Sequence, residues 1–233
     1  GVIDASGSLT AAGLKFTGLG AMGFNGYSAT NAFVVETGAR TLTLTGSNTG
    51  DNTVNLIIGD NSGATSILKT GTGRWILGGV NTYTGTTTVS AGTLETSATG
   101  VIAAGGTVNA LAGTTFSNAG TVNAAINIDG ATVVNAGSIG GDLTLNSGTF
   151  TNNAGATISQ VSLGKTVKVT GGAFTNAGTI ATNTLLEGGT LTSSGTMAGR
   201  ITVTGGTVAS TGTLTDLRLL GGSATSSGAI TKA

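Results

Sequence analysis

The sequence predicts an all-β protein that forms a single right-handed parallel β-solenoid (β-helix), with about 17 residues per coil in its C-terminal half. Composition is the first observation: the 233 residues include 43 Gly and no Pro, 38% are hydrophobic and only 8% are charged. Val, Ile, Leu and Thr dominate the remaining positions, which is typical of strands with frequent tight turns rather than of a disordered linker. The second observation is an internal repeat. Right-handedness is expected because parallel crossovers almost always have that hand.

The C-terminal half of the chain repeats at a nearly constant interval. From about residue 113 each unit contains a marker glycine, and the markers are Gly120, Gly137, Gly155, Gly178, Gly195, Gly212 and Gly228. The sequence numbers of successive markers differ by 17, 18, 23, 17, 17 and 16. We interpret the one long interval as an insertion of about six residues at a corner, around residues 164–168.

Apolar residues occupy fixed positions in this repeat. Phe116, Val133, Phe174, Leu191 and Val208 stand four residues before a marker, and Val122, Ile139, Ile180, Met197, Leu214 and Ile230 stand two residues after one. Further along each unit the apolar residues alternate, which is the signature of a strand with one buried face. So short a unit cannot bury its apolar face alone, whereas stacked coils bury it because each strand pairs with the same strand of the next coil. A two-sheet sandwich is the alternative, but it does not require a constant coil length.

A small polar residue stands two positions before each marker, and we expect these residues to form a structural ladder at a corner. The ladder residues are Asn118, Asn135, Asn153, Asn176, Ser193, Ser210 and Ser226. Stacked amides donate and accept hydrogen bonds along the axis, so they satisfy polar groups where the chain turns inward. The alternative is that these residues lie in surface turns.

The N-terminal part has the same composition and a less regular repeat. Its strand candidates are residues 13–16, 33–36, 40–44 and 54–58. We expect residues 1–100 to form N-terminal solenoid coils. Residues 101–233 then continue them without a break as regular coils of about 16–18 residues. About 12 coils are expected in all, with almost no helix.

A more specific pattern spans about residues 62–97. It reads Ser66-Ile67-Leu68-Lys69-Thr70-Gly71-Thr72-Gly73, then Arg74-Trp75-Ile76-Leu77, and later Asn81-Thr82-Tyr83-Thr84-Gly85. This segment strongly resembles the autotransporter-associated β-strand repeat, also called the passenger-associated transport repeat. The uncommon Asn-Thr-Tyr-x-Gly core makes the resemblance specific. Arg74 and Trp75 replace a small or aliphatic pair and Thr86 stands where Gly is common, but neither change breaks the alternation.

The resemblance implies a secreted protein, extracellular or at the cell surface of a Gram-negative-type bacterium, built on a β-helical passenger. It does not specify an activity, because passengers of this kind include adhesins, proteases, esterases and plain stalks. The C-terminal membrane barrel of autotransporters has no counterpart in this sequence, so we expect either a passenger segment or a secreted solenoid that uses the same repeat.

Composition excludes the commonest catalytic and metal sites. The chain has no His and no Cys, which removes the usual general base, the thiolate nucleophile and the commonest transition-metal ligands. A serine hydrolase would need a lysine base, but Lys15, Lys69, Lys165, Lys168 and Lys232 have no serine-nucleophile motif around them. Nine scattered cations balanced by nine anions do not form a nucleic-acid surface. We therefore expect no enzyme, no cofactor and no nucleic-acid partner.

Four acidic residues are the remaining candidates for a site. Asp129 and Asp142 are separated by less than one coil, so they do not stack as the carboxylate pair of a glycosidase, and solvated corners are the favoured interpretation. Asp51 and Asp60 flank a strand in a polar loop region. Calcium there is an open alternative, although the Gly-Gly-x-Gly-x-Asp nonapeptide of calcium-binding solenoids is absent.

Trp75 and Tyr83 are the two aromatic residues in the resembling segment, and a carbohydrate-stacking pair is one interpretation of them. The favoured interpretation is that both belong to the repeat pattern and pack on the solenoid.

The leading function is structural: a non-enzymatic extracellular stalk, spacer or fibre. The alternative is an adhesin segment that binds host or surface ligands on one face or at the insertion near Lys165. A binding module should interrupt its repeat with long aromatic-rich or charged loops, whereas this chain has one short interruption in its C-terminal half. No run of 18 apolar residues is present, so no membrane-spanning segment is expected.

Both ends of the predicted solenoid lack a capping segment, and Val2, Ile3 and Ile230 are candidate assembly residues. Open ends expose unpaired strand edges. We expect either end-to-end self-association into a head-to-tail filament or continuation within a longer passenger.

Overall fold

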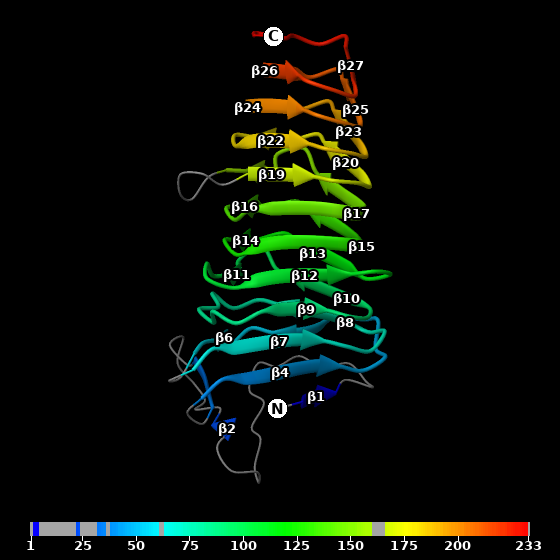
Figure 1. Cartoon of the computed structure of the whole chain (residues 1–233). Helices are drawn as coiled ribbons and strands as arrows, with labels where there is room; N and C mark the ends of the chain where they lie inside the picture. Colours follow the sequence, from blue (N-terminus) through cyan, green and yellow to red (C-terminus); the bar gives the residue numbers. More distant parts are fainter. Residues whose placement is uncertain are drawn as a thin grey trace.

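The computed structural model describes residues 2–4, 22–23, 32–35, 38–60, 63–159 and 166–232. Within these ranges the chain forms 27 strands and no helix. Figure 1 shows the strands stacked in one column, with the N-terminal coils at one end and the C-terminal coils at the other. The all-β parallel solenoid expected from the sequence is therefore confirmed.

Three parallel faces make up the solenoid. The first face contains β1 (Val2–Asp4), β4 (Arg40–Thr45), β7 (Thr65–Lys69), β9 (Thr87–Val89), β12 (Thr107–Leu111), the first parts of β15 (Ala125–Asn135) and β17 (Leu143–Asn152), β19 (Thr166–Val169), β22 (Asn183–Leu186), and the second parts of β24 (Thr196–Val203) and β26 (Thr213–Leu219). The second face contains β5 (Asn52–Val54), β8 (Arg74–Leu77), β10 (Thr93–Thr96), β13 (Thr115–Asn118), the second parts of β15 and β17, β20 (Ala173–Asn176), β23 (Thr190–Ser193), β25 (Thr207–Ser210) and β27 (Ser223–Ser226). The third, narrower face contains β11 (Val101–Ile102), β14 (Thr121–Val122), β16 (Ser138–Ile139), β18 (Thr157–Ile158), β21 (Thr179–Ile180) and the first parts of β24 and β26.

Three short strands lie in a separate small sheet near the N-terminal end. They are β2 (Met22–Gly23), β3 (Ala32–Val35) and β6 (Ile57–Ile58); β2 pairs antiparallel with β3, and β3 pairs parallel with β6.

The coil length varies more in the N-terminal half than in the C-terminal half. On the second face the register pairs Asn52 with Trp75, Trp75 with Leu94 and Leu94 with Phe116, so the sequence numbers of successive partners differ by 23, 19 and 22. Later partners on this face differ by 16 or 17, except Phe150 and Phe174, which differ by 24. Within the described residues the ten strands of the second face are separated by nine intervals, so the solenoid makes about nine turns rather than the twelve coils expected. The number is lower because the N-terminal coils are longer than the C-terminal repeat.

The hand of the coil is right-handed. In Figure 1 the strands of the first face run from left to right in front, and the chain returns behind them while it rises toward the C-terminus.

The core is one continuous column of inward side chains. Val108, Ile126, Leu143 and Val167 stack in register along the first face, and each is fully buried. On the second face the rings of Phe150 and Phe174 stack with centroids 4.7 Å apart. Because every inward position repeats in the next coil, apolar surface is removed from water on both sides of each residue, at about 25 cal/mol per Å².

The marker glycines are required by the close stacking of the coils at one corner. A Cβ atom on Gly137 would lie 2.1 Å from the carbonyl oxygen of Gly120, and one on Gly195 would lie 2.1 Å from that of Gly178. No side chain fits at these separations, so each of these markers is glycine because the marker of the preceding coil lies directly against it.

The expected insertion lies earlier than the sequence indicated. Residues 166–168, which we assigned to the insertion, belong to β19, and Val167 and Lys168 pair in register with Leu143 and Thr144. Relative to a 17-residue coil, two of the extra residues fall in the turn before β18 and five fall between β18 and β19. Residues 160–165 of the segment between β18 and β19, including Lys165, lie outside the described residues.

Candidate functional site

A continuous chain of buried polar side chains runs along the corner that follows the second face. Asn118 Nδ2 donates to Asn135 Oδ1 at 2.7 Å, and Asn135 Nδ2 donates to Asn152 Oδ1 at 2.8 Å. Asn152 Nδ2 then donates to Asn176 Oδ1 at 2.8 Å, and Asn176 Nδ2 donates to Ser193 Oγ at 3.1 Å. All the donors point toward the C-terminal end, so each amide accepts from the preceding coil and donates to the next.

Backbone carbonyls also accept hydrogen bonds from the amides of Asn118, Asn135 and Asn176. Asn135 Nδ2 also donates to the carbonyls of Gly137 and Thr157, both at 3.3 Å, and Asn135 Oδ1 accepts from the Gly137 N–H at 3.3 Å. Buried polar groups are costly without partners, so this corner stabilises the turn only while the ladder is complete.

Asn153 does not belong to the ladder, which corrects the sequence assignment by one residue. Asn152 pairs with Asn135 and Asn176 and is fully buried, whereas Asn153 is half-buried in the turn. The physical reason is a longer turn: Asn135 lies three residues before Ser138, but its partner Asn152 lies five residues before Thr157. Ala156 therefore occupies the marker position that the sequence assigned to Gly155.

The ladder changes at both ends. The chain of hydrogen bonds begins at Thr96, whose Oγ1 donates to Asn118 Oδ1. The marker pattern in the sequence did not include Thr96. After Ser193, the hydroxyl of Ser210 donates to the Ser193 backbone carbonyl at 3.2 Å. Ser226 stacks in register on Ser210 but is exposed because it lies in the last strand of the face.

Lys69 is a fully buried cation in the segment of residues 62–97 that resembles the autotransporter repeat. Its Nζ donates to the carbonyls of Thr70, Gly71 and Ala91, each at 2.8 Å. Burial lowers the pKa of Lys69 to about 8. The motif did not mark this residue as buried, although Lys69 lies two positions after the inward Ile67 and so belongs to the inward set of β7. Its three acceptors are backbone carbonyls at a turn, so it fixes the turn rather than activating a nucleophile.

Asn81 links three successive coils in the same segment. Its Oδ1 accepts from the Ile58 N–H at 2.9 Å, and its Nδ2 donates to the carbonyls of Gly79 and Val101, both at 3.0 Å. The side chain is buried, so the Asn of the Asn-Thr-Tyr core replaces missing strand hydrogen bonds at a corner.

Trp75 and Tyr83 pack inside the solenoid, which confirms the favoured interpretation and excludes an exposed carbohydrate platform at these two rings. Trp75 is fully buried and its Nε1 donates to the Thr45 carbonyl at 2.9 Å. The Tyr83 hydroxyl lies 2.7 Å from Thr87 Oγ1, and burial raises the pKa of Tyr83 despite this hydrogen bond. Both rings contribute core area and satisfy their polar atoms internally.

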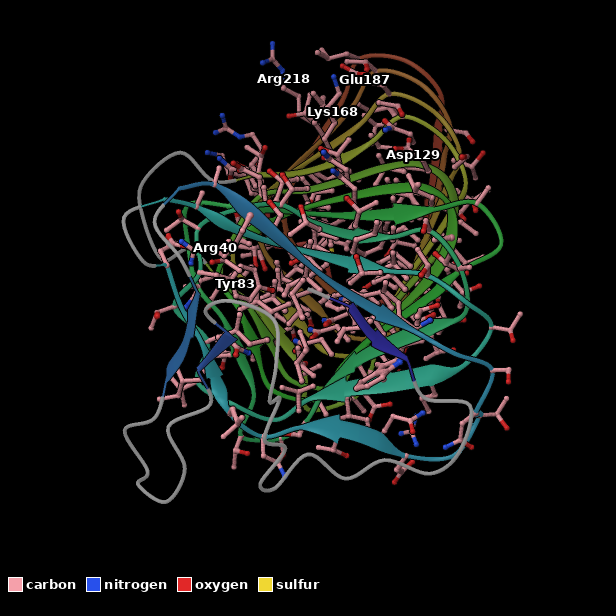
Figure 2. The ribbon with its side chains drawn as sticks, turned by 90° about the horizontal axis from the view of Figure 1, so that it is seen from below. Arg40, Tyr83, Asp129, Lys168, Glu187 and Arg218 are labelled. Carbon is pink, nitrogen blue, oxygen red and sulfur yellow. The ribbon has the colours of Figure 1, made fainter. Side chains whose placement is uncertain are left out.

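Charged side chains on the surface pair across neighbouring coils. Arg74 bridges Asp51 and Glu95, with 2.7 Å between Arg74 Nη2 and Glu95 Oε2. Lys168 pairs with Glu187 at 3.0 Å, and Figure 2, which looks along the column, shows both residues on the same side of the coil as Arg218. Arg200 pairs with Asp216 at 2.8 Å. These pairs reinforce the stacking of coils, each by less than about 1 kcal/mol.

The other acidic candidates have partners within the protein. Asp129 accepts from Asn146 Nδ2 at 2.7 Å, and Asp142 accepts from the Thr166 N–H at 2.8 Å. Asp60 accepts from Thr84 Oγ1 at 2.6 Å and from the Thr65 N–H at 2.7 Å. Burial raises the pKa of Asp60, but these hydrogen bonds outweigh it and leave the pKa below its ordinary value.

No metal-type cluster forms among the side chains that the structure describes. In those ranges, no three acidic residues converge as they would around a metal ion, and Asp51 pairs with Arg74 instead. Lys15 and Lys165 lie outside the described residues, Lys168 pairs with Glu187, and Lys232 lies exposed at the last coil.

The candidate assembly residues lie at opposite ends of the column. Val2 and Ile3 pair in β1 with Thr43 and Leu44 of β4, and Ile230 forms the last bridge, with Leu214. In the described chain, no helix is long and apolar enough to span a membrane.

The described chain is a parallel β-solenoid that carries the segment around Lys69 and Asn81, a combination similar to that of autotransporter passengers. Comparison with known proteins supports this class: residues 67–95 match the family described as passenger-associated-transport-repeat. The chain is also similar to the Adhesin BmaC autotransporter of Brucella suis biovar 1 (strain 1330), with 48% identity over 58 residues. That match covers 24% of this chain and 2% of the relative, so the chain spans a small part of the relative's length. No solved structure matches the chain significantly.

Proposed function

We propose that this chain is a non-enzymatic structural part of a surface passenger, a rigid stalk that holds other parts of the protein at a distance from the cell. The observation that carries the proposal is the continuity of the core and of the polar ladder. From Thr96 to Ser193 each coil donates a side-chain hydrogen bond to the next, and the inward apolar columns run in register beside the ladder.

The buried polar groups also support a structural function. Lys69, Asn81, Trp75 and Tyr83 are the chemically distinctive residues of the repeat, and each directs its polar atoms to neighbouring protein groups. A secreted location at the surface of a Gram-negative-type bacterium follows from the same proposal, since the repeat and the similar adhesin belong to autotransporters.

Coil duplication tests the stalk directly. Phe174 pairs with Leu191 and Leu191 with Val208, so residues 174–207 make two complete coils. A second copy of this segment should lengthen the purified chain by about 10 Å in small-angle X-ray scattering, because each coil rises about 4.8 Å. An unchanged maximum dimension would contradict a stalk built by axial stacking.

An adhesin segment is the second candidate, favoured by the name of the similar Brucella protein. Saturable binding of the purified chain to host cells or immobilised matrix glycoproteins would favour it. A chain that lengthens with added coils and shows no such binding would leave the stalk as the function.

End-to-end self-association is a further candidate, favoured by the apolar surface of the last coil. Leu219, Leu220 and Ile230 are 51%, 58% and 41% exposed. A further coil, from the same chain or from a second copy, would bury them. Analytical ultracentrifugation at rising concentration tests the second copy: filament growth that is lost on Ile230→Lys supports it, and a constant monomer mass contradicts it.

A further inference from the structure

The outward surface of the second face is built from small, uncharged residues. From β13 to β27 the second face presents two outward residues in each of seven successive coils. The pairs are Thr115 and Ser117, Thr132 and Val134, Thr149 and Thr151, Ala173 and Thr175, Thr190 and Thr192, Thr207 and Ala209, and Ser223 and Thr225. All fourteen are small and uncharged, nine are Thr, and none is buried. We call this surface the threonine array.

The array is a regular two-dimensional lattice. The register is unbroken across these seven strands, so each column stacks directly from coil to coil. Neighbouring coils are spaced by about 4.8 Å, and the two residues of a pair by about 6.6 Å along the strand. Thr is stiff at χ1, so its hydroxyl and methyl groups repeat at these spacings with little loss of rotamer entropy on contact.

The other broad face of the same coils is built differently. The narrow third face also presents Thr or Ser outward, but only one such residue per coil, in Thr121, Ser138, Thr157, Thr179, Thr196 and Thr213. The outward column of the first face over the same region contains Asn109, Asn127, Thr144, Lys168, Leu185, Thr202 and Arg218. That face also holds the ion pairs of Lys168 with Glu187 and of Arg200 with Asp216. Two faces of the same coils therefore differ in charge and regularity.

Hydroxyl groups in the middle of the array are available to an outside partner. Among the residues that the structure describes, the hydroxyls of Thr149, Thr151, Thr190 and Thr192 make no hydrogen bond within the protein. Charged groups, which would hold their own hydration water, are absent from all fourteen positions. The array therefore suits a partner that is itself flat, neutral, rich in hydrogen-bonding groups and periodic.

We propose that the threonine array binds ice. The surface of hexagonal ice is uncharged, consists entirely of hydrogen-bonding groups, and has repeats comparable to the two spacings of the array. Rows of methyl groups would order the intervening water, and rows of hydroxyl groups would join it to the lattice. A single contact of this kind is weak, but seven registered coils present an array about 29 Å long in which the contacts act together.

Ice partitioning of the purified chain tests this inference. During slow freezing the protein should enter the ice phase, and it should inhibit ice recrystallisation. The variant Thr151→Gln, Thr192→Gln places longer flexible side chains at two positions of the array and should lose both effects. The matched control Thr144→Gln, Thr202→Gln makes the same change on the first face and should keep them.

Circular dichroism and thermal melting must first show that both variants keep the strand signal. Exclusion of the unmodified chain from ice would overturn the inference, as would equal loss in the array variant and its control. Binding to crystalline cellulose or chitin that depends on the array, without ice partitioning, would also overturn it by identifying a polysaccharide surface instead. None of these outcomes depends on the stalk proposal, whose test is the length of the rod.

Discussion

Replacing Asn152 by Ala should break the polar ladder in the middle of the solenoid. The substitution removes the acceptor of the 2.8 Å hydrogen bond from Asn135 and the donor of the 2.8 Å hydrogen bond to Asn176. Asn135 Nδ2 keeps its contacts to two backbone carbonyls, but Asn176 Oδ1 loses its donor inside a fully buried corner. Two lost bonds at about 1 kcal/mol each and one orphaned acceptor lower the free energy of unfolding by about 3 kcal/mol.

The neighbouring variant Asn153→Ala is the matched control. Asn153 is half-buried in the turn, and its backbone carbonyl still accepts from Ala156. We expect a loss below about 0.5 kcal/mol. Guanidinium unfolding followed by circular dichroism measures both variants, and amide hydrogen exchange should show local loss of protection near residue 176 only for Asn152→Ala. Equal losses, or a larger loss for Asn153→Ala, would refute the ladder.

The remaining predictions concern the core, the marker glycines and pH. Ile180→Asp should unfold its coil and the neighbouring coils, because a charge would enter a dry column, whereas Thr196→Lys should change the melting temperature little; equal shifts would contradict the assigned facing. Gly195→Ala should destabilise by several kcal/mol or prevent folding, since its Cβ would lie 2.1 Å from a carbonyl oxygen, and a neutral result in thermal melting would contradict the stacking. Burial lowers the pKa of Lys69 from 10.5 to about 8, so between pH 8 and pH 10.5 the unfolded chain binds more protons than the folded chain. The free energy of unfolding should therefore rise with pH across this range, by roughly 2 kcal/mol at pH 10. Above pH 10 the raised pKa of Tyr83 opposes this rise, because the unfolded tyrosine ionises first. Urea titrations of the protein and of Lys69→Met across pH 7–10 test the pH prediction, and a rise that persists in the variant would contradict it.

The solenoid could be predicted from the sequence because its inward positions repeat. Leu191 and Val208, for example, stand at the same point of successive units, and the structure pairs them in register. A constant interval between apolar residues predicts both that successive strands run parallel and which residues pair, because only in-register stacking places each apolar residue on the equivalent apolar residue of the next coil.

Register across turns of different length could not be predicted in the same way. Counting back from Gly155 selects Asn153, but a turn two residues longer moves the buried position to Asn152. The two residues are identical, so only stacking on Asn135 distinguishes them. The same difficulty misplaced the insertion. The sequence does not show whether Val167 lies in the insertion or in the apolar column, and the structure places it in the column, in register with Leu143.

The repeat at residues 67–95 was identified by its motif, but its chemistry needed the structure. Composition marks Lys69 as a surface residue, and only the alternation with Ile67 indicates that it points inward. In the structure, the hydrogen-bond partners of the Lys69 ammonium group are three backbone carbonyls and include no carboxylate. Those carbonyls come from a turn and from the next coil, contacts that no local pattern records.

Distances between spin labels along one outward column test the central claim, that the chain rises by one strand spacing per coil whatever the coil length. The chain has no Cys, so pairs introduced at Thr93 with Thr149, Thr190 or Ser223 would be the only labelled sites. These pairs are separated by three, five and seven coils, and the coil between Phe150 and Phe174 is longer than the others. We expect narrow distributions centred near about 14, 24 and 34 Å, at about 4.8 Å per coil. Broad distributions, or distances that follow the number of residues instead of the number of coils, would contradict the claim.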